Sequence, residues 1–395
     1  MIRSSLALLL APLLMTACTP DITIPKGPEE IPSDPAPPDA GTWLSMGTAP
    51  DGQRLVISYY DRELGGLGFA TGTPQADDTI SWYYEQVDGY GDESTGLDSG
   101  DRGKYSSMKV APDGTVWVTY YDATFKTLRW AHRTGGPKSW VTGVVDAGPN
   151  VGTWCSLALD STGKPEVSYH DDANGTLKLA KLSDGGNEID GATWTSETIM
   201  TGTPFSGVDA AGADISRPAD VGTFSRLLIT GGTEFVAYYD AGQQRLGFAS
   251  RTGAGTFNGN DISPQGANMG QWPSILRDGE TLYIAYHDVQ NQNLMVASGT
   301  PGGWVHEIAD AGEFVGADSE VVKRGGNIGV IYFDGMNNDM KYVSKQGTVW
   351  VAETVGSKKE PVGFHNEIVK LGNFWWVASY DFATKTLFTK KLADE

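Results

Sequence analysis

Residues 116–122 read Val-Trp-Val-Thr-Tyr-Tyr-Asp, and variants of this phrase occur six more times along the chain. In each copy a β-branched residue stands four positions before the Asp, and an aromatic residue or His directly precedes it. Because apolar groups occupy both faces, the phrase predicts a strand in a sheet that is covered on each side. The copies end at Asp61, Asp122, Asp171, Asp240, Asp288, Asp334 and Asp381.

Three weaker strand signals accompany most copies of the phrase. A segment such as 152–157 precedes it, a Leu or Met six residues after the Asp marks a third strand, and a Trp or Phe beyond a Gly-rich turn marks a fourth. Four short strands in each of seven units predict an all-β fold, a seven-bladed β-propeller of four-stranded antiparallel blades. A ring suits such units because each blade needs a neighbour to cover its faces.

The last unit stops after its third strand, at residues 387–392. Its fourth strand is either missing or supplied from the N-terminal side, where residues 22–25 are the candidate. Long loops are expected at residues 86–104, 183–192 and 201–220, where the interval between repeats is extended.

The N-terminus reads as an export signal. Residues 1–17, MIRSSLALLLAPLLMTA, combine one Arg, an apolar run and small residues, as in a secretory signal peptide. Met15-Thr16-Ala17-Cys18 resembles the lipobox of bacterial lipoproteins; the alternative is an ordinary signal peptide with a chance Cys. The resemblance implies cleavage before Cys18, lipidation of its sulfur and a membrane anchor, with Thr19 favouring the outer membrane.

The expected domains are therefore a signal peptide at 1–17, a lipidated Cys and Pro-rich linker at 18–41, and the propeller at 42–395. Cys155 is the other cysteine, so no disulfide within the chain is expected once Cys18 is lipidated. The net charge of −20 argues against nucleic acid as a partner, because phosphate binding needs clustered Lys and Arg.

Residues 42–395 resemble the secreted seven-bladed propellers of bacteria. The turn from Ser183-Asp184-Gly185 to Thr193-Trp194 resembles a degraded Asp-box of the sialidase and BNR-repeat families. No blade carries the compact Ser-x-Asp-x-Gly-x-Thr-Trp pattern, and the Phe/Tyr-Arg-Ile-Pro segment of those sialidases is missing. The resemblance therefore implies a shared architecture without the sialidase catalytic motifs.

Features that all repeats share are expected to serve the architecture. An Asp at the end of a strand accepts hydrogen bonds from backbone N–H groups of the following turn, so we assign this structural role to the seven repeat Asp residues. The Tyr two positions earlier is expected to pack between blades.

Function is expected where the repeats differ. At the start of the first strand, beside the channel mouth, five blades carry an aromatic residue, which either stacks on a ligand or seals adjacent blades. Two positions further, four blades carry Ser and three carry a charged residue. The predicted ligand-binding rim comprises Trp43, Tyr105, Trp154, Phe224, Arg226, Trp272, Asp318, Glu320, His365 and Glu367.

These residues favour a lipid-anchored envelope protein that binds a glycan or an envelope protein without catalysis. Two alternatives stay open: a glycan-cleaving hydrolase or lyase, and a scaffold subunit of an outer-membrane complex. The alternative catalytic set is His365, Glu367, Glu320 and Asp318. No cofactor is expected; calcium is considered for the acidic insertion that contains Asp88, Asp92, Glu93, Asp98 and Asp101.

Overall fold

The computed structural model describes residues 31–91, 100–183, 193–208, 212–264, 268–357 and 361–393. Contacts divide the chain into Met1–Pro32 and a compact unit, Ser33–Glu395, and every strand belongs to this second unit. The signal peptide, Cys18 and residues 22–25 lie outside the described residues. Within the described ranges the chain forms no helix, and so none that has the length and apolarity to cross a membrane.

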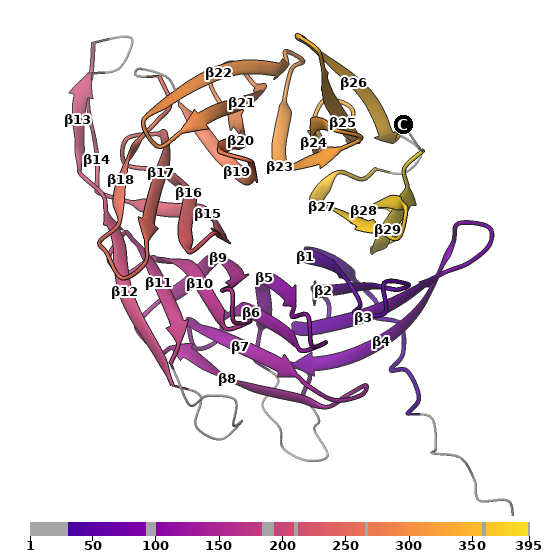
Figure 1. Cartoon of the computed structure of the whole chain (residues 1–395). Helices are drawn as coiled ribbons and strands as arrows, with labels where there is room; N and C mark the ends of the chain where they lie inside the picture. The colour runs from indigo at the N-terminus through magenta and orange to yellow at the C-terminus, as the bar shows by residue number, and fades with distance from the viewer. Residues whose placement is uncertain are drawn as a thin grey trace, which may run out of the picture. The chain divides into compact units, whose positions relative to one another are not determined.

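Seven antiparallel sheets follow one another around a ring (Figure 1), which confirms the all-β, seven-bladed propeller. Blade 1 is β1 (Ala40–Thr48), β2 (Leu55–Asp61), β3 (Gly66–Pro74) and β4 (Ile80–Asp88). Blade 2 is β5 (Arg102–Val110), β6 (Val116–Asp122), β7 (Thr127–Arg133) and β8 (Trp140–Asp146). Blade 3 is β9 (Val151–Leu159), β10 (Pro165–Asp171), β11 (Thr176–Leu182) and β12 (Trp194–Thr201).

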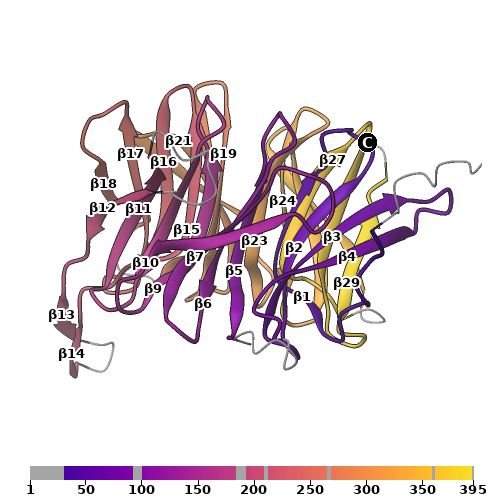
Figure 2. The same ribbon diagram turned by 90° about the horizontal axis from the view of Figure 1, so that it is seen from below.

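Blade 4 follows a separate hairpin, β13 (Phe205–Val208) with β14 (Asp214–Arg217), that extends away from the ring (Figure 2). It is β15 (Val221–Thr230), β16 (Thr233–Asp240), β17 (Arg245–Thr252) and β18 (Asn258–Asp261). Blade 5 is β19 (Met269–Asp278), β20 (Thr281–Asp288), β21 (Asn293–Thr300) and β22 (Gly303–Asp310). Blade 6 is β23 (Val315–Arg324), β24 (Asn327–Asp334), β25 (Asp339–Gln346) and β26 (Val349–Gly356). Blade 7 is β27 (Phe364–Leu371), β28 (Phe374–Asp381) and β29 (Thr386–Lys391), with three strands in the described part of the chain.

The first strands lie nearest the axis and contact one another around the ring, including β1 with β27 (Figure 1). The second strands carry the repeated phrase and are almost wholly buried. Their Tyr side chains pack between blades, and some also donate a hydrogen bond to the preceding blade. For example, the Tyr169 hydroxyl donates to Asp146 at the end of the preceding blade, 2.6 Å away. The repeat thus builds the seams between blades.

Each repeat Asp accepts a hydrogen bond from the backbone of its own turn. Asp122 Oδ1, for example, accepts the N–H groups of Thr124 and Phe125 at 3.0 and 2.9 Å. The same bond occurs after Asp61, Asp171, Asp240, Asp288, Asp334 and Asp381. These carboxylates therefore stabilise the turns that follow them, as expected.

The ring closes through contacts between blades 7 and 1. Asp39 accepts the Tyr380 hydroxyl at 2.7 Å, and the Ala40 N–H donates to the Lys385 carbonyl at 3.0 Å. The N–H of Asp34 donates to the carbonyl of Tyr84 on β4. Residues 33–41, which we expected to belong to the linker, are therefore part of the propeller unit, and its first strand begins two residues before position 42.

Candidate functional site

A β-bulge near the start of each first strand turns one side chain toward the channel. The strand register shifts at this point in all seven blades. The residue there, called the bulge residue, has a positive φ of 45–61° in every blade. Left-handed backbone costs a non-glycine residue about 1 kcal/mol or more, so its sevenfold recurrence marks a built feature. The bulge residues are Trp43, Tyr105, Trp154, Phe224, Trp272, Asp318 and His365.

A glycine two residues before the bulge residue lets neighbouring blades approach closely. Gly152, for example, has a φ of 107°, and a Cβ on it would lie 2.7 Å from the Cβ of Leu128 in the preceding blade. All seven blades have glycine at this position with a φ between 98° and 120°. This sequence signal, which we had not used, locates each bulge.

The residue that follows the bulge residue in five blades donates a hydrogen bond to the bulge residue of the preceding blade. Ser106 Oγ donates to the Trp43 carbonyl at 2.6 Å, and Cys155 Sγ donates to the Tyr105 carbonyl at 2.9 Å. Ser225, Ser319 and Asn366 donate in the same way to the bulge residues of the blades before them. Cys155 is therefore one of five equivalent structural donors. Burial raises its pKa to about 12, so its sulfur stays a neutral thiol.

Two residues beyond the bulge residue lies what we call the link position, where a Ser hydroxyl joins adjacent blades. Ser274 Oγ accepts the Val321 N–H at 2.9 Å. Ser45, Ser107 and Ser156 accept the N–H groups of Met108, Leu157 and Leu227. Arg226, Glu320 and Glu367 occupy the link positions of blades 4, 6 and 7, and none of them makes this bond within the described residues. Blade docking therefore does not explain these three charged side chains.

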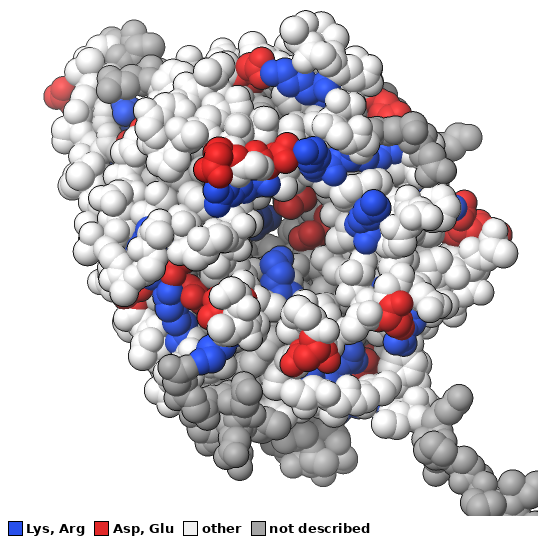
Figure 3. All heavy atoms as spheres, viewed as in Figure 1, with Lys and Arg blue, Asp and Glu red and all other residues white. Residues whose placement is uncertain are grey.

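The bulge residues surround one cavity of about 200 Å³ in the channel. Acidic and basic side chains approach one another in the hollowed centre of the ring on the face seen in Figure 3. Nine of the ten predicted rim residues line the cavity; Glu320 lies beside it on β23. The lining residues predicted from sequence are Trp43, Tyr105, Trp154, Phe224, Arg226, Trp272, Asp318, His365 and Glu367.

Five aromatic bulge residues, which we call the collar, form a continuous arc around this cavity. Successive ring centroids lie 4.0–5.2 Å apart, and the planes are tilted by 43–56°. His365 extends the arc, 5.4 Å from Trp43. The rings therefore contact one another across neighbouring blades, as expected for residues that seal the blades, and they also line the cavity. Their stacking on a ligand stays a prediction. The collar is Trp43, Tyr105, Trp154, Phe224 and Trp272.

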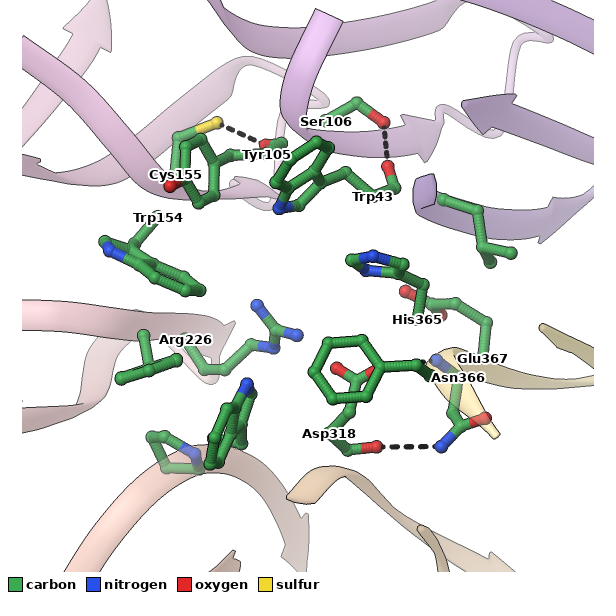
Figure 4. A pocket seen from close by; sticks show the side chains of 15 residues that line it. Trp43, Tyr105, Ser106, Trp154, Cys155, Arg226, Asp318, His365, Asn366 and Glu367 are labelled. Atoms are coloured by element: carbon green, nitrogen blue, oxygen red, sulfur yellow. Dashed lines mark hydrogen bonds between the residues drawn. The ribbon is translucent and has the colours of Figure 1, made fainter. Parts of the chain in front are cut away.

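The polar groups of the cavity are only partly satisfied. The Arg226 guanidinium reaches toward its middle (Figure 4). Among the described residues, Arg226, Glu320 and Glu367 form no hydrogen bond or ion pair with one another or with other side chains. Asp318 differs, since one of its oxygens accepts the Asn366 N–H at 2.8 Å. Unpaired charges in a partly buried cavity are costly and indicate groups available to a ligand.

Burial shifts the protonation of these groups. Burial and the charge of Glu320 raise the pKa of Glu367 to about 8, although Lys109 and Arg226 oppose this shift. Burial raises the pKa of Asp318 to about 6 and also raises that of Glu320. Burial, together with Arg62 and Arg226, lowers the pKa of His365 to about 3. Near pH 7 the cavity therefore holds a neutral imidazole and a protonated Glu367.

Sequence reasoning missed some lining residues, among them Phe364 and Asn366. The Phe364 ring lies 5.1 Å from His365 and 6.2 Å from Trp272, which completes the apolar wall. It precedes the bulge residue, where the other blades have polar or small residues, so the repeat gave no signal for it. Asn366 replaces the usual small donor and holds Asp318 in place through both backbone and side chain.

Where the structure describes the acidic insertion, its carboxylates pair with Lys and Arg side chains of the same chain. Asp88 pairs with Arg102 and Arg129, and Asp101 pairs with Lys104. Asp92, Glu93 and Asp98 lie outside the described residues. Across the described ranges, no group of three or more His, Cys, Asp or Glu side chains is arranged to hold a metal ion.

No model of a known protein family matches the chain, and no curated protein matches its sequence. Several solved structures match its fold. An ulvan lyase of polysaccharide lyase family PL25 is 12% identical, with a TM-score of 0.53 over 88% of this chain and 93% of that one. The polysaccharide lyase Uly1 is 8% identical, with a TM-score of 0.52 over 91% and 90%. A mutant of AofleA from Arthrobotrys oligospora is 11% identical, with a TM-score of 0.50 over 91% of each chain. At these identities the likeness establishes the propeller fold.

Proposed function

We propose that this protein binds a glycan without cleaving it, by taking one sugar ring into the channel cavity. The observation that carries the proposal is the collar of five aromatic rings around charged groups that have no partner in the described chain. Sugar rings present apolar C–H faces and polar hydroxyl edges, and so they suit aromatic faces combined with hydrogen-bonding side chains.

The size of the cavity favours one ring. At about 200 Å³ it is somewhat larger than the ~150 Å³ cavities that hold a benzene molecule. A pyranose with its hydroxyl groups fits that volume, whereas an oligosaccharide does not. We therefore infer that the glycan inserts end-on, through a terminal sugar.

Arg226 and Asp318 suit the hydroxyl groups of such a sugar. A hydroxyl both donates and accepts hydrogen bonds, whereas a guanidinium only donates and a carboxylate only accepts. The two side chains form no ion pair with each other, so each is available to a hydroxyl between them. The bonds of Asn366 to the Asp318 carboxylate and carbonyl limit the entropy lost on binding.

A glycan array with purified protein tests this function. Trp154→Ala and Trp272→Ala each remove a collar ring and are expected to abolish the signals. Trp350→Ala is the matched control, since this Trp lies on the outer strand β26 and does not line the cavity. Signals that survive both collar substitutions would contradict the proposal.

We also propose that the protein is a lipoprotein of the bacterial outer membrane, anchored through Cys18. The support is the sequence Met15-Thr16-Ala17-Cys18 after an apolar export signal. Cys18→Ala should release the protein from isolated membranes into the soluble fraction. Membrane retention of this variant would refute lipidation as the anchor.

A second candidate function is glycan cleavage, favoured by one feature of the cavity. His365 and Glu367 lie two residues apart on β27, and near pH 7 the first is an unprotonated base and the second a protonated acid. Two of the structures that share the fold are named polysaccharide lyases. In a lyase reaction, the base would take a ring proton and the acid would protonate the leaving oxygen, which creates a C=C bond.

Incubation with polysaccharides distinguishes the two functions. A lyase product absorbs far-ultraviolet light through its new conjugated double bond and also has a new reducing end, whereas a hydrolase product shows new reducing ends without this absorbance. Turnover that is lost in His365→Asn and Glu367→Gln, with thermal stability retained, would establish catalysis. Binding of a glycan that remains intact over long incubation supports the binding function.

A further inference from the structure

The seams between blades show how this chain places two neighbouring carboxylates. At the seam of blades 2 and 3, the Lys178 ammonium lies 2.6 Å from Asp146 and 4.0 Å from Asp171. The same arrangement recurs between blades 5 and 6, with Lys341 between Asp310 and Asp334. An ammonium group between two carboxylates offsets both their burial and their mutual repulsion.

The cavity contains a pair of carboxyl groups without such an ammonium. Glu320 and Glu367 occupy the link positions of adjacent blades, and the charge of Glu320 contributes to the raised pKa of Glu367. Neither forms an ion pair within the part of the chain that the structure describes. Lys109, the lysine whose charge acts on both, is exposed on β5 and does not line the cavity.

The balance of charge also favours a cationic ligand group. Asp318 and Glu367 are carboxyl groups among the residues that line the cavity, and Arg226 is the one Lys or Arg among them. Outside the lining, the charges of Glu320 and Lys109 also act on Glu367. The collar adds aromatic faces, which attract an ammonium group by cation–π interaction. Arg226 repels a cation, so it favours an orientation in which a ligand nitrogen lies toward the Glu320 and Glu367 side.

We propose that the sugar bound in the cavity is an amino sugar with a free, protonated amine, which completes the carboxylate pair Glu320 and Glu367. This inference rests on the proposed glycan-binding function and specifies its ligand. The ligand ammonium takes the place that Lys178 and Lys341 have at the seams, and the sugar hydroxyls bond to Arg226 and Asp318.

The proposal implies that binding releases a proton. Near pH 7 Glu367 holds a proton because burial and Glu320 disfavour its ionised form. An ammonium beside it reverses this preference, and the proton passes to the buffer. The other charged groups around it are Glu320 and Asp318 on β23, Arg226 on β15 and Lys109 on β5, with neutral His365 on its own strand.

Isothermal titration calorimetry with methyl glycosides tests the ligand class. Each amino sugar is compared with its N-acetylated and its hydroxyl counterparts, in the gluco, galacto and manno configurations, at pH 7. In one configuration the free amine should bind about tenfold tighter than both counterparts, as expected for a hydrogen-bonded charge pair. Titrations in phosphate and in Tris should show release of about one proton, because the two buffers differ in heat of ionisation.

Variants test which carboxyl groups are responsible for the preference for the free amine. In Glu320→Gln with Glu367→Gln, the preference for the amine should fall to about twofold or less. Glu353→Gln, an exposed Glu of β26, is the control and should keep the full preference. If the double variant does not fold, proton release by the unmodified protein still tests the proposal.

The outcomes distinguish the amino-sugar inference from the glycan-binding function. Tighter binding of a neutral or an acidic sugar would overturn the amino-sugar inference and leave glycan binding intact. If no sugar of any charge binds in calorimetry or on the array, the proposed function itself is wrong. Binding of the amine without proton release would contradict the role of Glu367.

Discussion

Cys155 donates its S–H to the carbonyl oxygen of Tyr105, 2.9 Å away, across the seam between blades 2 and 3. In three other blades a Ser makes this bond to a collar residue, and in a fourth Asn366 makes it to Asp318, so the thiol serves as a substitute for a hydroxyl. The bond fixes a bulge residue whose left-handed backbone would otherwise relax. The buried Cys155 therefore has a structural role, in holding adjacent blades together beside the cavity.

This role predicts that Cys155→Ser keeps the melting temperature within about 1 °C and leaves glycan binding unchanged, since Ser makes the same bond elsewhere. Cys155→Ala loses the bond and should lower the free energy of unfolding by about 1 kcal/mol. Chemical denaturation of both variants measures the difference. If the Ser variant loses its activity toward glycans while it stays folded, the sulfur has a chemical role.

Arg226→Ser should stabilise the protein and abolish binding. The variant restores the link residue, whose hydroxyl can accept the Ile275 N–H as Ser274 accepts that of Val321. It also removes an unpaired charge, so an increase in melting temperature of roughly 2–4 °C is expected. Differential scanning calorimetry and the glycan array measure the two effects. A less stable variant that still binds would show that Arg226 serves the architecture.

Stability should depend on pH through Glu367. Its pKa is raised from 4.5 to about 8, so between these values the folded protein holds a proton that the unfolded chain releases. The free energy of unfolding therefore decreases as the pH rises through this window. Glu367→Gln does not ionise, and its melting temperature should equal that of the wild type near pH 4.5 and exceed it by about 2–4 °C above pH 8. A difference that does not change with pH would contradict a raised pKa.

Stability should also depend on pH through His170, which lies outside the cavity. Burial disfavours its charged form, but the hydrogen-bonded Asp172 and Asp220 outweigh this and raise its pKa from 6.5 to about 9. The resulting stability is fully present below pH 6.5 and is lost as the pH rises through about 9. His170→Tyr, with the residue that other repeats have, should be less stable than the wild type at pH 6 and similar to it near pH 10. Thermal melts across this range measure the difference, and parallel curves would refute the ion pair.

The sequence predicted the fold because its signal repeats. A buried strand that ends in Asp before a turn has the same physical requirements in each blade, so seven weak patterns reinforce one another. The N-terminal edge was harder to place, because Asp39 acts through bonds to Tyr380 and Arg62, distant in the sequence, that no local pattern indicates.

The cavity was partly predictable for the same reason. Comparison of equivalent positions identified the collar and the charged residues that replace Ser, since departures from a repeat are visible in the sequence. The roles of Cys155 and Asn366 were not visible, because hydrogen bonds between blades depend on the bulge geometry. Phe364 joins the wall only because blade 7 has an aromatic residue at a position that is polar or small elsewhere.

The most direct test of the central claim is an NMR titration of the indole N–H signals with the methyl glycosides. Of the 12 Trp residues, only Trp43, Trp154 and Trp272 line the cavity in the described structure. A sugar that binds there should shift these three signals and leave the other indole signals in place. Binding that shifts other indoles, with these three unchanged, would contradict a glycan site in the channel.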